Sequence, residues 1–291
     1  MEMFFAAPAR LAAPIMRKSE MMPVVDWNQV WQKSRMENSV VRRDPDFWDK
    51  RAVEFTRHAT KTDYIGQFLQ IMKPEPDWSV LDIGCAAGTL AVPLAPAVKS
   101  VTALDPSPVM LSLLEKRCRD HDIANIRAVK GRWQDDWDDL GIGVHDVAVA
   151  SRSLMVDDLR EAVVKLQGRA RKRVYLTALV GDGPYDRKIV EAAGRKFSLG
   201  ADYIVVYNLL HQMGIYANIA ITKTSRDADY AGVDEALDSM RWMVFEMGCE
   251  EEDRVAKFLR STLVLEQGRY RLPYSRIERW AVIWWNLNQA L

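Results

Sequence analysis

Short apolar runs alternate with helical patterns through the middle of the chain. The runs cover residues 79–83, 100–104, 125–129, 146–150 and 173–178. Segments with helical spacing lie between them, such as PVMLSLLEKRCRD and MVDDLREAVVKLQGRA. This alternation is typical of βαβ units, whose strands form a parallel sheet that helices cover on both faces. We therefore predict an α/β fold with a doubly wound, mostly parallel sheet.

A different pattern precedes the first of these strands. Helical spacing begins at Asp26 and stops before the sequence KPEPD, so we expect a helical lid over residues 26–72. The chain before it has an acid at Glu2, where a signal peptide has a basic start, and we expect residues 1–25 to form a flexible arm. Residues 73–291 then make up the main predicted domain.

The last third of the chain departs from the alternation. YIVVYNLLHQMG predicts a buried helix, while IYANIAITK and RIERWAVIWWN predict two strands. The sequence between these strands predicts a helical insert over about residues 226–265. Its apolar side chains either line a substrate pocket or pack the insert onto the sheet. They are Met240, Trp242, Met243, Phe245 and Met247.

Composition argues against several classes of function. Lys plus Arg and Asp plus Glu both total 40, and a zero net charge argues against a general nucleic-acid binder. No apolar run reaches the roughly 20 residues of a membrane helix, so we expect no membrane partner. Cys85, Cys118 and Cys249 are scattered and show no metal-ligand spacing. We therefore expect a metal-free protein of the reducing cytoplasm, and the sequence is compatible with a homodimer.

The sequence DIGCAAG at the end of the first predicted strand has the form of a glycine-rich nucleotide-binding turn. Ala86 stands where a G-x-G-x-x-G pattern has its middle glycine, which hinders close approach to a pyrophosphate. Asp82 precedes Gly84 and would repel that pyrophosphate. S-adenosylmethionine (SAM) has no phosphate and carries an ammonium and a sulfonium, so this turn favours SAM over NAD(P).

The second predicted strand ends in LDPSPVML. Its Asp105 lies 17 residues after Gly88, where an acid can accept hydrogen bonds from two ribose hydroxyls. Asp105 is also placed to cap the helix that follows, and the two roles are compatible. The two motifs together therefore predict a nucleoside-binding sheet edge.

On these residues the chain resembles the class I SAM-dependent methyltransferases. VLDIGCAAG resembles the first motif of that family and LDPSPVML resembles the second, within a resemblance that runs from about Phe47 to Thr177. The family has a seven-stranded, Rossmann-like sheet. The resemblance implies that the chain binds SAM, releases S-adenosylhomocysteine and methylates an acceptor.

The resemblance also implies a set of cofactor contacts. Asp82 and the turn from Gly84 through Cys85 and Ala86 to Gly88 would surround the methionine part of SAM. Asp105 would hold the ribose, and Pro106 and Met110 would pack near the adenine. As an alternative, Met110 is an ordinary core residue.

The third and fourth motifs are less regular. The third motif of the family often reads Gly-Asp, but Arg132 replaces the acid here, and Trp133 or Asp135 would make the adenine contact instead. The fourth predicted strand ends in VAVASRSLMVDD, so Ser151, Arg152 and Ser153 should face the cofactor and the acceptor. Arg152 also suits a structural ion pair.

No catalytic side chain is identified in the sequence. Methyl transfer from a sulfonium needs alignment and a dry pocket more than a catalytic triad. The fourth strand lacks the N-P-P-[YF] or D-P-P-[YF] sequence of enzymes that methylate nucleic-acid amino groups. We therefore expect a small-molecule acceptor. A nucleic-acid or protein methyltransferase, and a SAM-binding protein without transferase activity, are the alternatives.

The aromatic residues of the predicted lid have two interpretations. Trp27, Trp31, Phe47 and Trp48 either cover the cofactor, as such N-terminal helices often do in the family, or belong to an ordinary core.

Overall fold

A computed structural model of the chain describes residues 25–37, 45–59, 63–198 and 200–287. The predicted flexible arm lies outside the described residues except for Val25, and so does the side chain of Phe47. Within the described part of the chain, no helix is both long and apolar enough to cross a membrane.

Seven strands form one sheet in the order β3-β2-β1-β4-β5-β10-β6. The first five strands along the chain run parallel to one another, and β10 pairs antiparallel with both β5 and β6. The strands are β1 (Ser79–Ile83), β2 (Ser100–Asp105), β3 (Ile126–Lys130), β4 (His145–Ala150), β5 (Ala170–Leu179), β6 (Asn218–Arg226) and β10 (Arg276–Asn286). The predicted α/β fold with a doubly wound, mostly parallel sheet is confirmed.

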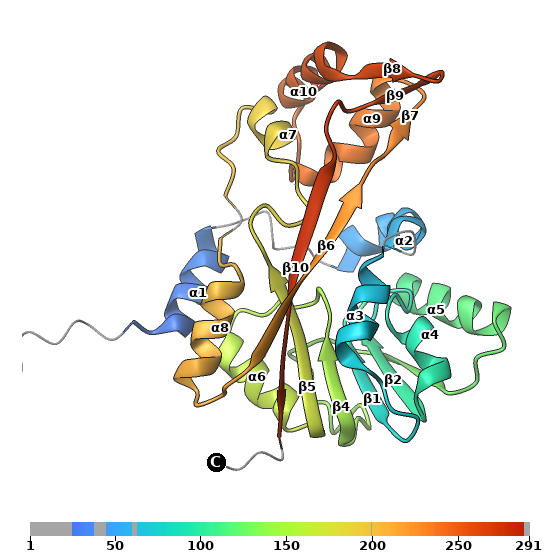
Figure 1. Cartoon of the computed structure of the whole chain (residues 1–291), viewed down its shortest axis with the longest axis vertical. Helices are drawn as coiled ribbons and strands as arrows, with labels where there is room; N and C mark the ends of the chain where they lie inside the picture. The colour runs from blue at the N-terminus through green and yellow to red at the C-terminus, as the bar shows by residue number, and fades with distance from the viewer. Residues whose placement is uncertain (1–24, 38–44, 60–62, 199, 288–291) are drawn as a thin grey trace, which may run out of the picture.

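Helices cover both faces of this sheet (Figure 1). One face packs against α1 (Trp27–Glu37), α6 (Leu159–Gln167) and α8 (Tyr203–Gln212). The other packs against α3 (Tyr64–Met72), the short α4 (Ala91–Leu94), the 3-10 turn η3 (Ala95–Ala97) and α5 (Pro108–Asp120). Neighbouring residues of β1 alternate between the two cores, with Val80 in one and Leu81 in the other. Two-sided burial explains why the central strands read as continuous apolar runs.

Local sequence sets the helix that follows β2. Ser107 lies just before α5, and its hydroxyl accepts a hydrogen bond from the Met110 backbone at 3.0 Å. Pro108 occupies the first turn, where its missing N–H costs no hydrogen bond. The N-cap predicted at Asp105 is therefore Ser107, because the helix begins at Pro108, three residues after the end of the strand.

The three N-terminal helices lie in different places. α1 packs on α8 and α6, and the Trp31 indole donates a 3.0 Å hydrogen bond to the Val156 carbonyl. α2 (Pro45–Ala59) packs on α5, where Ala52 is buried beside Ala87 and Met110. α3 lies against the other face of the sheet from α1 and contacts β6. Among the described residues of these helices, those at the carboxyl ends of the parallel strands belong to α2 and α3.

β6 and β10 extend beyond the main sheet into a smaller lobe (Figure 1). Its core is a separate apolar cluster, and residues of the predicted helical insert over 226–265 belong to it. The elements of the lobe are α7 (Arg187–Ala192), β7 (Asp229–Tyr230), α9 (Val233–Met240), the 3-10 turn η4 (Arg241–Met243), α10 (Cys249–Thr262), β8 (Val264–Glu266) and β9 (Arg269–Arg271). The lobe thus also contains a three-stranded sheet, β7-β9-β8, and one helix from between β5 and α8.

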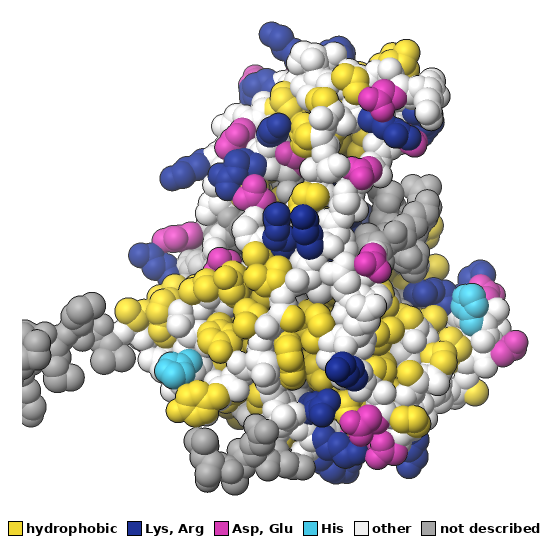
Figure 2. Space-filling view, in the orientation of Figure 1, with side chains coloured by type: hydrophobic (Ala, Val, Ile, Leu, Met, Phe, Trp, Pro, Cys, Tyr) yellow, Lys and Arg dark blue, Asp and Glu magenta, His cyan; other side chains and the backbone are white. Residues whose placement is uncertain are grey.

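The surface differs between the two parts of the molecule. Figure 2 shows many charged side chains on the lobe, whereas apolar side chains gather over α8, β6 and the neighbouring part of the main sheet. Tyr216, Ile219 and Ile221 are among the exposed apolar residues there.

Candidate active site

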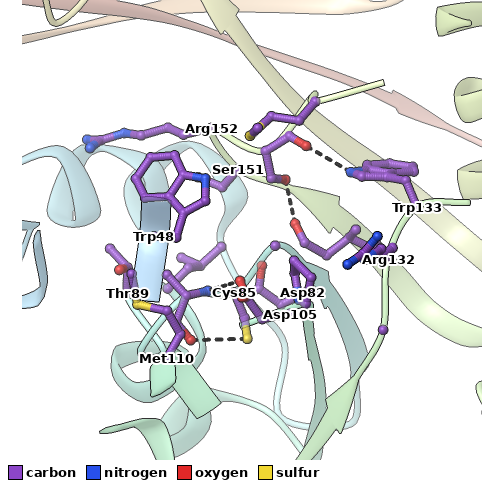
Figure 3. Close-up of a pocket in the computed structure, with 18 of the residues that line it drawn as sticks. Trp48, Asp82, Cys85, Thr89, Asp105, Met110, Arg132, Trp133, Ser151 and Arg152 are labelled. Carbon is purple, nitrogen blue, oxygen red and sulfur yellow. Dashed lines mark hydrogen bonds between the residues drawn. The ribbon is translucent and has the colours of Figure 1, made fainter. Parts of the chain in front are cut away.

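A cavity of about 360 Å³ opens at the carboxyl ends of β1, β2 and β4 (Figure 3). This is the edge at which open α/β sheets bind ligands. Its walls come from α2, α3 and the segments that follow β1 to β4. The lining residues are Trp48, Phe55, Tyr64, Asp82, Ile83, Gly84, Cys85, Ala86, Thr89, Leu90, Asp105, Pro106, Met110, Gly131, Arg132, Trp133, Gln134, Ser151, Arg152, Ser153 and Met155.

The turn after β1 adopts a glycine-like backbone at the position where glycine is missing. Ala86 has a φ of 49°, in the left-handed region that residues with a Cβ enter at a cost of roughly 1–2 kcal/mol. Gly84 has a φ of 71°, and a Cβ there would lie 2.3 Å from the Ser153 Cβ. Backbone strain of this kind clusters at functional sites, and here the Asp105 carboxylate, which accepts from the Ala86 N–H, holds the turn in this shape.

Gly88 has a different role from the rest of the turn. It does not line the cavity, and a Cβ on it would lie 2.4 Å from Leu114 Cδ1 and 2.8 Å from Val92 Cγ2. With a φ of 74°, it lets the chain after the turn pack closely against α5. Close helix packing therefore requires glycine at this position, and the predicted cofactor contact of Gly88 stays a prediction.

The carboxylate of Asp105 ties the turn to the end of β2. Asp105 Oδ2 accepts a 2.8 Å hydrogen bond from the Ala86 N–H, and Oδ1 accepts one of 2.9 Å from the Ser107 N–H. A carboxylate has about four lone-pair sites, so two remain for hydroxyl donors. Burial raises the pKa of Asp105, although these two backbone hydrogen bonds oppose the shift.

Asp82 lies at the bottom of the cavity with one oxygen unused. It is 1% exposed, and its Oδ2 has no hydrogen-bond partner within the described residues. Burial, and then the charge of Asp105, raise the pKa of Asp82 to about 7. A buried carboxylate oxygen without a donor is costly, so the site has room for a cationic or hydrogen-donating ligand group.

The segment after β3 forms one wall. Arg132 and Trp133 both line the cavity, and Arg132 is exposed. The Trp133 indole donates a 2.8 Å hydrogen bond to the Ser153 carbonyl, which fixes the ring against the segment after β4. Asp135 does not line the cavity, because its carboxylate accepts a 2.8 Å hydrogen bond from the Arg132 N–H and closes the turn.

The segment after β4 forms the opposite wall. The hydroxyls of Ser151 and Tyr64 are hydrogen bonded at 2.7 Å, and the Ser153 hydroxyl donates to the Ile83 carbonyl. Arg152 lines the cavity beside them, as expected from the sequence. Tyr64 was not predicted from the sequence because its helical spacing marks it only as a buried residue of α3.

The remaining predicted residues also lie at this cavity. Pro106, Met110 and Cys85 line it, with Met110 and Cys85 almost fully buried. Met110 is thus both a core residue and a wall residue, which joins the two interpretations of its position. Burial raises the pKa of the Cys85 thiol well above its usual value, so this cysteine is no thiolate nucleophile.

The two predicted covers of the site contribute unequally to the cavity wall. Of the aromatic residues in the N-terminal helices, Trp48 lines the cavity, whereas Trp27 and Trp31 pack in the core under α1. The apolar residues of the lobe also lie elsewhere: Met240 and Met243 are buried in the core of the lobe, and Trp242 and Met247 pack against it. Among the described residues, the lobe contributes none to the cavity wall.

Comparison with known proteins gives the family. Residues 80–172 match a family described as a methyltransferase domain. An uncharacterized protein of Haemophilus influenzae is 32% identical over 269 residues, which is 91% of this chain and 98% of that protein. The chain belongs to the class I SAM-dependent methyltransferases. This methyltransferase is therefore an enzyme with SAM as its cofactor.

Further similarities agree with the fold and the activity. A cypemycin N-terminal methyltransferase of Streptomyces is 30% identical over 134 residues, 44% of this methyltransferase and 52% of that protein. A putative methyltransferase of Bacillus halodurans has a TM-score of 0.54 at 14% identity, with 77% of this chain and 98% of that one covered. The YcgJ protein of Bacillus subtilis has a TM-score of 0.51 at 16% identity, with 80% and 100% covered.

Proposed function

We propose that this methyltransferase modifies a small-molecule acceptor in the cavity at the carboxyl edge of its sheet. The observation that carries the proposal is the size of that cavity, about 360 Å³. Ligand pockets span roughly 300–1,000 Å³, so the cofactor would fill most of this one and leave room for a modest acceptor. The rings of Trp48, Phe55 and Tyr64 line it, which suits an acceptor with apolar surface.

The cofactor contacts follow from the unused polar groups of the site. Asp82 Oδ2 would accept from the ammonium of SAM, and Asp105 would accept from the ribose hydroxyls with its free lone pairs. The backbone of Gly84, Cys85 and Ala86 would border the methionine part. Pro106 and Met110 would pack against the adenine, with Arg132, Trp133 and Ser151 completing the walls.

The residues of the chain would contribute alignment and exclusion of water. The bound cofactor supplies a methyl group already activated on a sulfonium. Burial raises the pKa of Tyr64, so its phenol stays neutral and orients Ser151 without acting as a base. α2 covers the turn through Ala52, Trp48 and Phe55, which favours an in-line, desolvated approach of the acceptor.

The test combines binding with turnover. SAM and S-adenosylhomocysteine should bind in calorimetric titrations, and NAD(H) should not. Incubation with radiolabelled SAM and a protein-free metabolite extract should then yield a labelled small molecule. Label that enters only protein or nucleic acid, when a whole lysate replaces the extract, would exclude the small-molecule acceptor.

A second candidate is suggested by one relative. The Streptomyces protein is named for methylation at an N-terminus, and it matches 44% of this chain. An amine at a peptide N-terminus would be the corresponding acceptor here. Short peptides with free and acetylated N-termini, offered side by side, separate this candidate from the first.

The compartment and the oligomeric state stay predictions. Free Cys85, Cys118 and Cys249 support a reducing cytoplasm. Exposed Ile219 and Ile221 on the edge strand β6 support a homodimer, which light scattering would detect.

A further inference from the structure

Arg152 has an unusual backbone at the rim of the cavity. It follows β4 with a φ of 57°, in the left-handed region that a residue with a Cβ seldom adopts. The buried Thr177 hydroxyl accepts a 2.7 Å hydrogen bond from the Arg152 N–H and holds that conformation. The backbone is therefore fixed in a way that sets the direction of the side chain.

The guanidinium of Arg152 stacks on aromatic rings. Its central carbon lies 3.6 Å from the centre of the Tyr64 ring and 5.3 Å from that of Trp280. Stacking uses the flat face of a guanidinium and leaves its N–H edges for hydrogen bonds. The side chain is 14% exposed and lines the cavity.

The edge formed by Nε and Nη2 has no partner. Both nitrogens are buried and have no hydrogen bond within the described residues. The third nitrogen, Nη1, lies 3.7 Å from Glu278 Oε1, which accepts a 2.6 Å hydrogen bond from the Trp280 indole. The Nε–Nη2 edge is the fork that binds a carboxylate through two parallel hydrogen bonds.

Charge balance also calls for an anion. Glu278 is 3% exposed on its side chain and serves two guanidiniums, because Arg226 Nε lies 2.8 Å from its Oε2. Another buried acid, Asp186, lies 4.0 Å from a third guanidinium, that of Arg276. Among the described residues, Arg152 and Arg226 thus share one carboxylate, which leaves this group with one excess positive charge in a poorly solvated place.

We propose that Arg152, stacked on Tyr64, forms a subsite that binds a carboxylate of the methyl acceptor. The inference rests on the proposed small-molecule function. Arg152 reaches toward Trp280 of β10, which β4 and β5 separate from β1 and its Asp82. Three strand spacings, about 14 Å, separate β10 from β1, so the guanidinium lies toward the β10 side of the cavity and away from the strand that carries Asp82. In Figure 3 the side chain runs along the cavity away from Arg132 and Trp133.

The probes for this subsite are phenylacetate and phenylacetamide, which differ in the carboxylate, together with short aliphatic carboxylates and their amides. Each is titrated into the full chain saturated with S-adenosylhomocysteine, and tryptophan fluorescence or calorimetry reports binding. We expect carboxylates to bind at least about tenfold more tightly than the matched amides, because only they form the two charge-assisted hydrogen bonds.

Three variants locate the effect. Arg152→Gln should lower carboxylate affinity to the level of the amide, and Arg152→Lys should recover only part of it, because an ammonium lacks the fork. Arg187→Gln is the control: this exposed arginine of the lobe pairs with Asp182 and does not line the cavity, so the change should alter carboxylate affinity by less than about threefold. Affinity for S-adenosylhomocysteine within about threefold of the wild type shows that each variant is folded.

Three results would overturn the subsite. One is equal binding of carboxylates and amides, or no binding of any carboxylate even at millimolar concentration. Another is unchanged carboxylate affinity in Arg152→Gln. The third is a loss of S-adenosylhomocysteine affinity in Arg152→Gln that is absent with a decarboxylated cofactor analogue, which would assign Arg152 to the cofactor instead. Labelling of a polymer with the carboxylate preference intact would reject the small-molecule function and leave the subsite.

Discussion

Two buried carboxylates at the ends of neighbouring strands define the chemistry of this site. Asp105 is used by the protein itself, because it holds the Ala86 and Ser107 backbones, whereas Asp82 keeps one oxygen unpaired. Ala86 adds backbone strain beside them. Such local costs lower the free energy of unfolding of the cofactor-free protein. A bound cofactor offsets them, so SAM should raise the free energy of unfolding.

The pH dependence of stability tests the burial of Asp82. Its folded pKa of about 7 lies above the ordinary value of about 3.9, so its contribution to stability is full below pH 4 and is lost as the pH rises through 7. Asp82→Asn should therefore raise the free energy of unfolding of the cofactor-free protein at pH 8 by on the order of 2–4 kcal/mol. Urea unfolding at a series of pH values measures this.

The gain in Asp82→Asn should shrink toward zero near pH 4, where the wild-type carboxyl is neutral in both states. An equal gain at pH 4 and pH 8 would show that the effect is steric. With SAM the order should reverse, because the cofactor ammonium favours the ionised Asp82 and the variant loses that contact.

Asp105 supports a prediction about cofactor affinity. Asp105→Ala should weaken SAM binding by about 1–3 kcal/mol, because two ribose hydroxyls lose their acceptor and the Ala86 and Ser107 N–H groups lose theirs. Calorimetry gives the dissociation constants. Asp120→Ala, on the exposed end of α5, removes a similar charge and should leave affinity unchanged. If both variants bind SAM like the wild type, the ribose is held elsewhere.

At the scale of elements, the sequence predicted those whose burial pattern is long and regular. The apolar runs gave β1 to β5 to within a few residues, and β10 matches RIERWAVIWWN. The strands β7, β8 and β9 were missed because two or three residues are too few to show a period. The acids and turn residues of the site were predicted from their spacing, whereas Tyr64 reaches it through tertiary packing alone.

The junction between the turn and its helices yields a stability prediction. Gly88→Ala should lower the free energy of unfolding by about 2–4 kcal/mol, from a positive φ and from overlap with Leu114 and Val92. Gly143→Ala is the control, because its Cβ would meet nothing within 4 Å. Denaturant unfolding compares the two. Equal stability of both variants would mean that α5 moves freely and that the packing role of Gly88 is wrong.

At the scale of the molecule, a pair of strands connects the main sheet, with its two cores, to the separate core of the lobe. β6 and β10 extend from the main sheet into the lobe. At the lobe end of this strand pair, Arg226 of β6 lies opposite Arg276 of β10. Glu278 of β10 lies among Arg226 of β6, Arg152 from the cavity and the nearby Arg276. This acid therefore links the lobe, the sheet and the rim of the active site.

Glu278 should thus matter far more than a surface acid. Burial would raise its pKa, but Arg152 and Arg226 outweigh burial, so the pKa lies below its ordinary value. A lowered folded pKa gives stability that is present above about pH 4.3 and is lost as the pH falls through the folded pKa.

Glu278→Gln should lower the free energy of unfolding at pH 7 by about 3 kcal/mol, because it leaves buried guanidiniums without their acid. Glu250→Gln, at an exposed helical pair with Arg254, should cost less than about 0.5 kcal/mol. The deficit of Glu278→Gln should disappear below the folded pKa. A deficit that persists below the folded pKa, or one no larger than that of Glu250→Gln, would show that the charge of Glu278 does not stabilise the connection between the main sheet and the lobe.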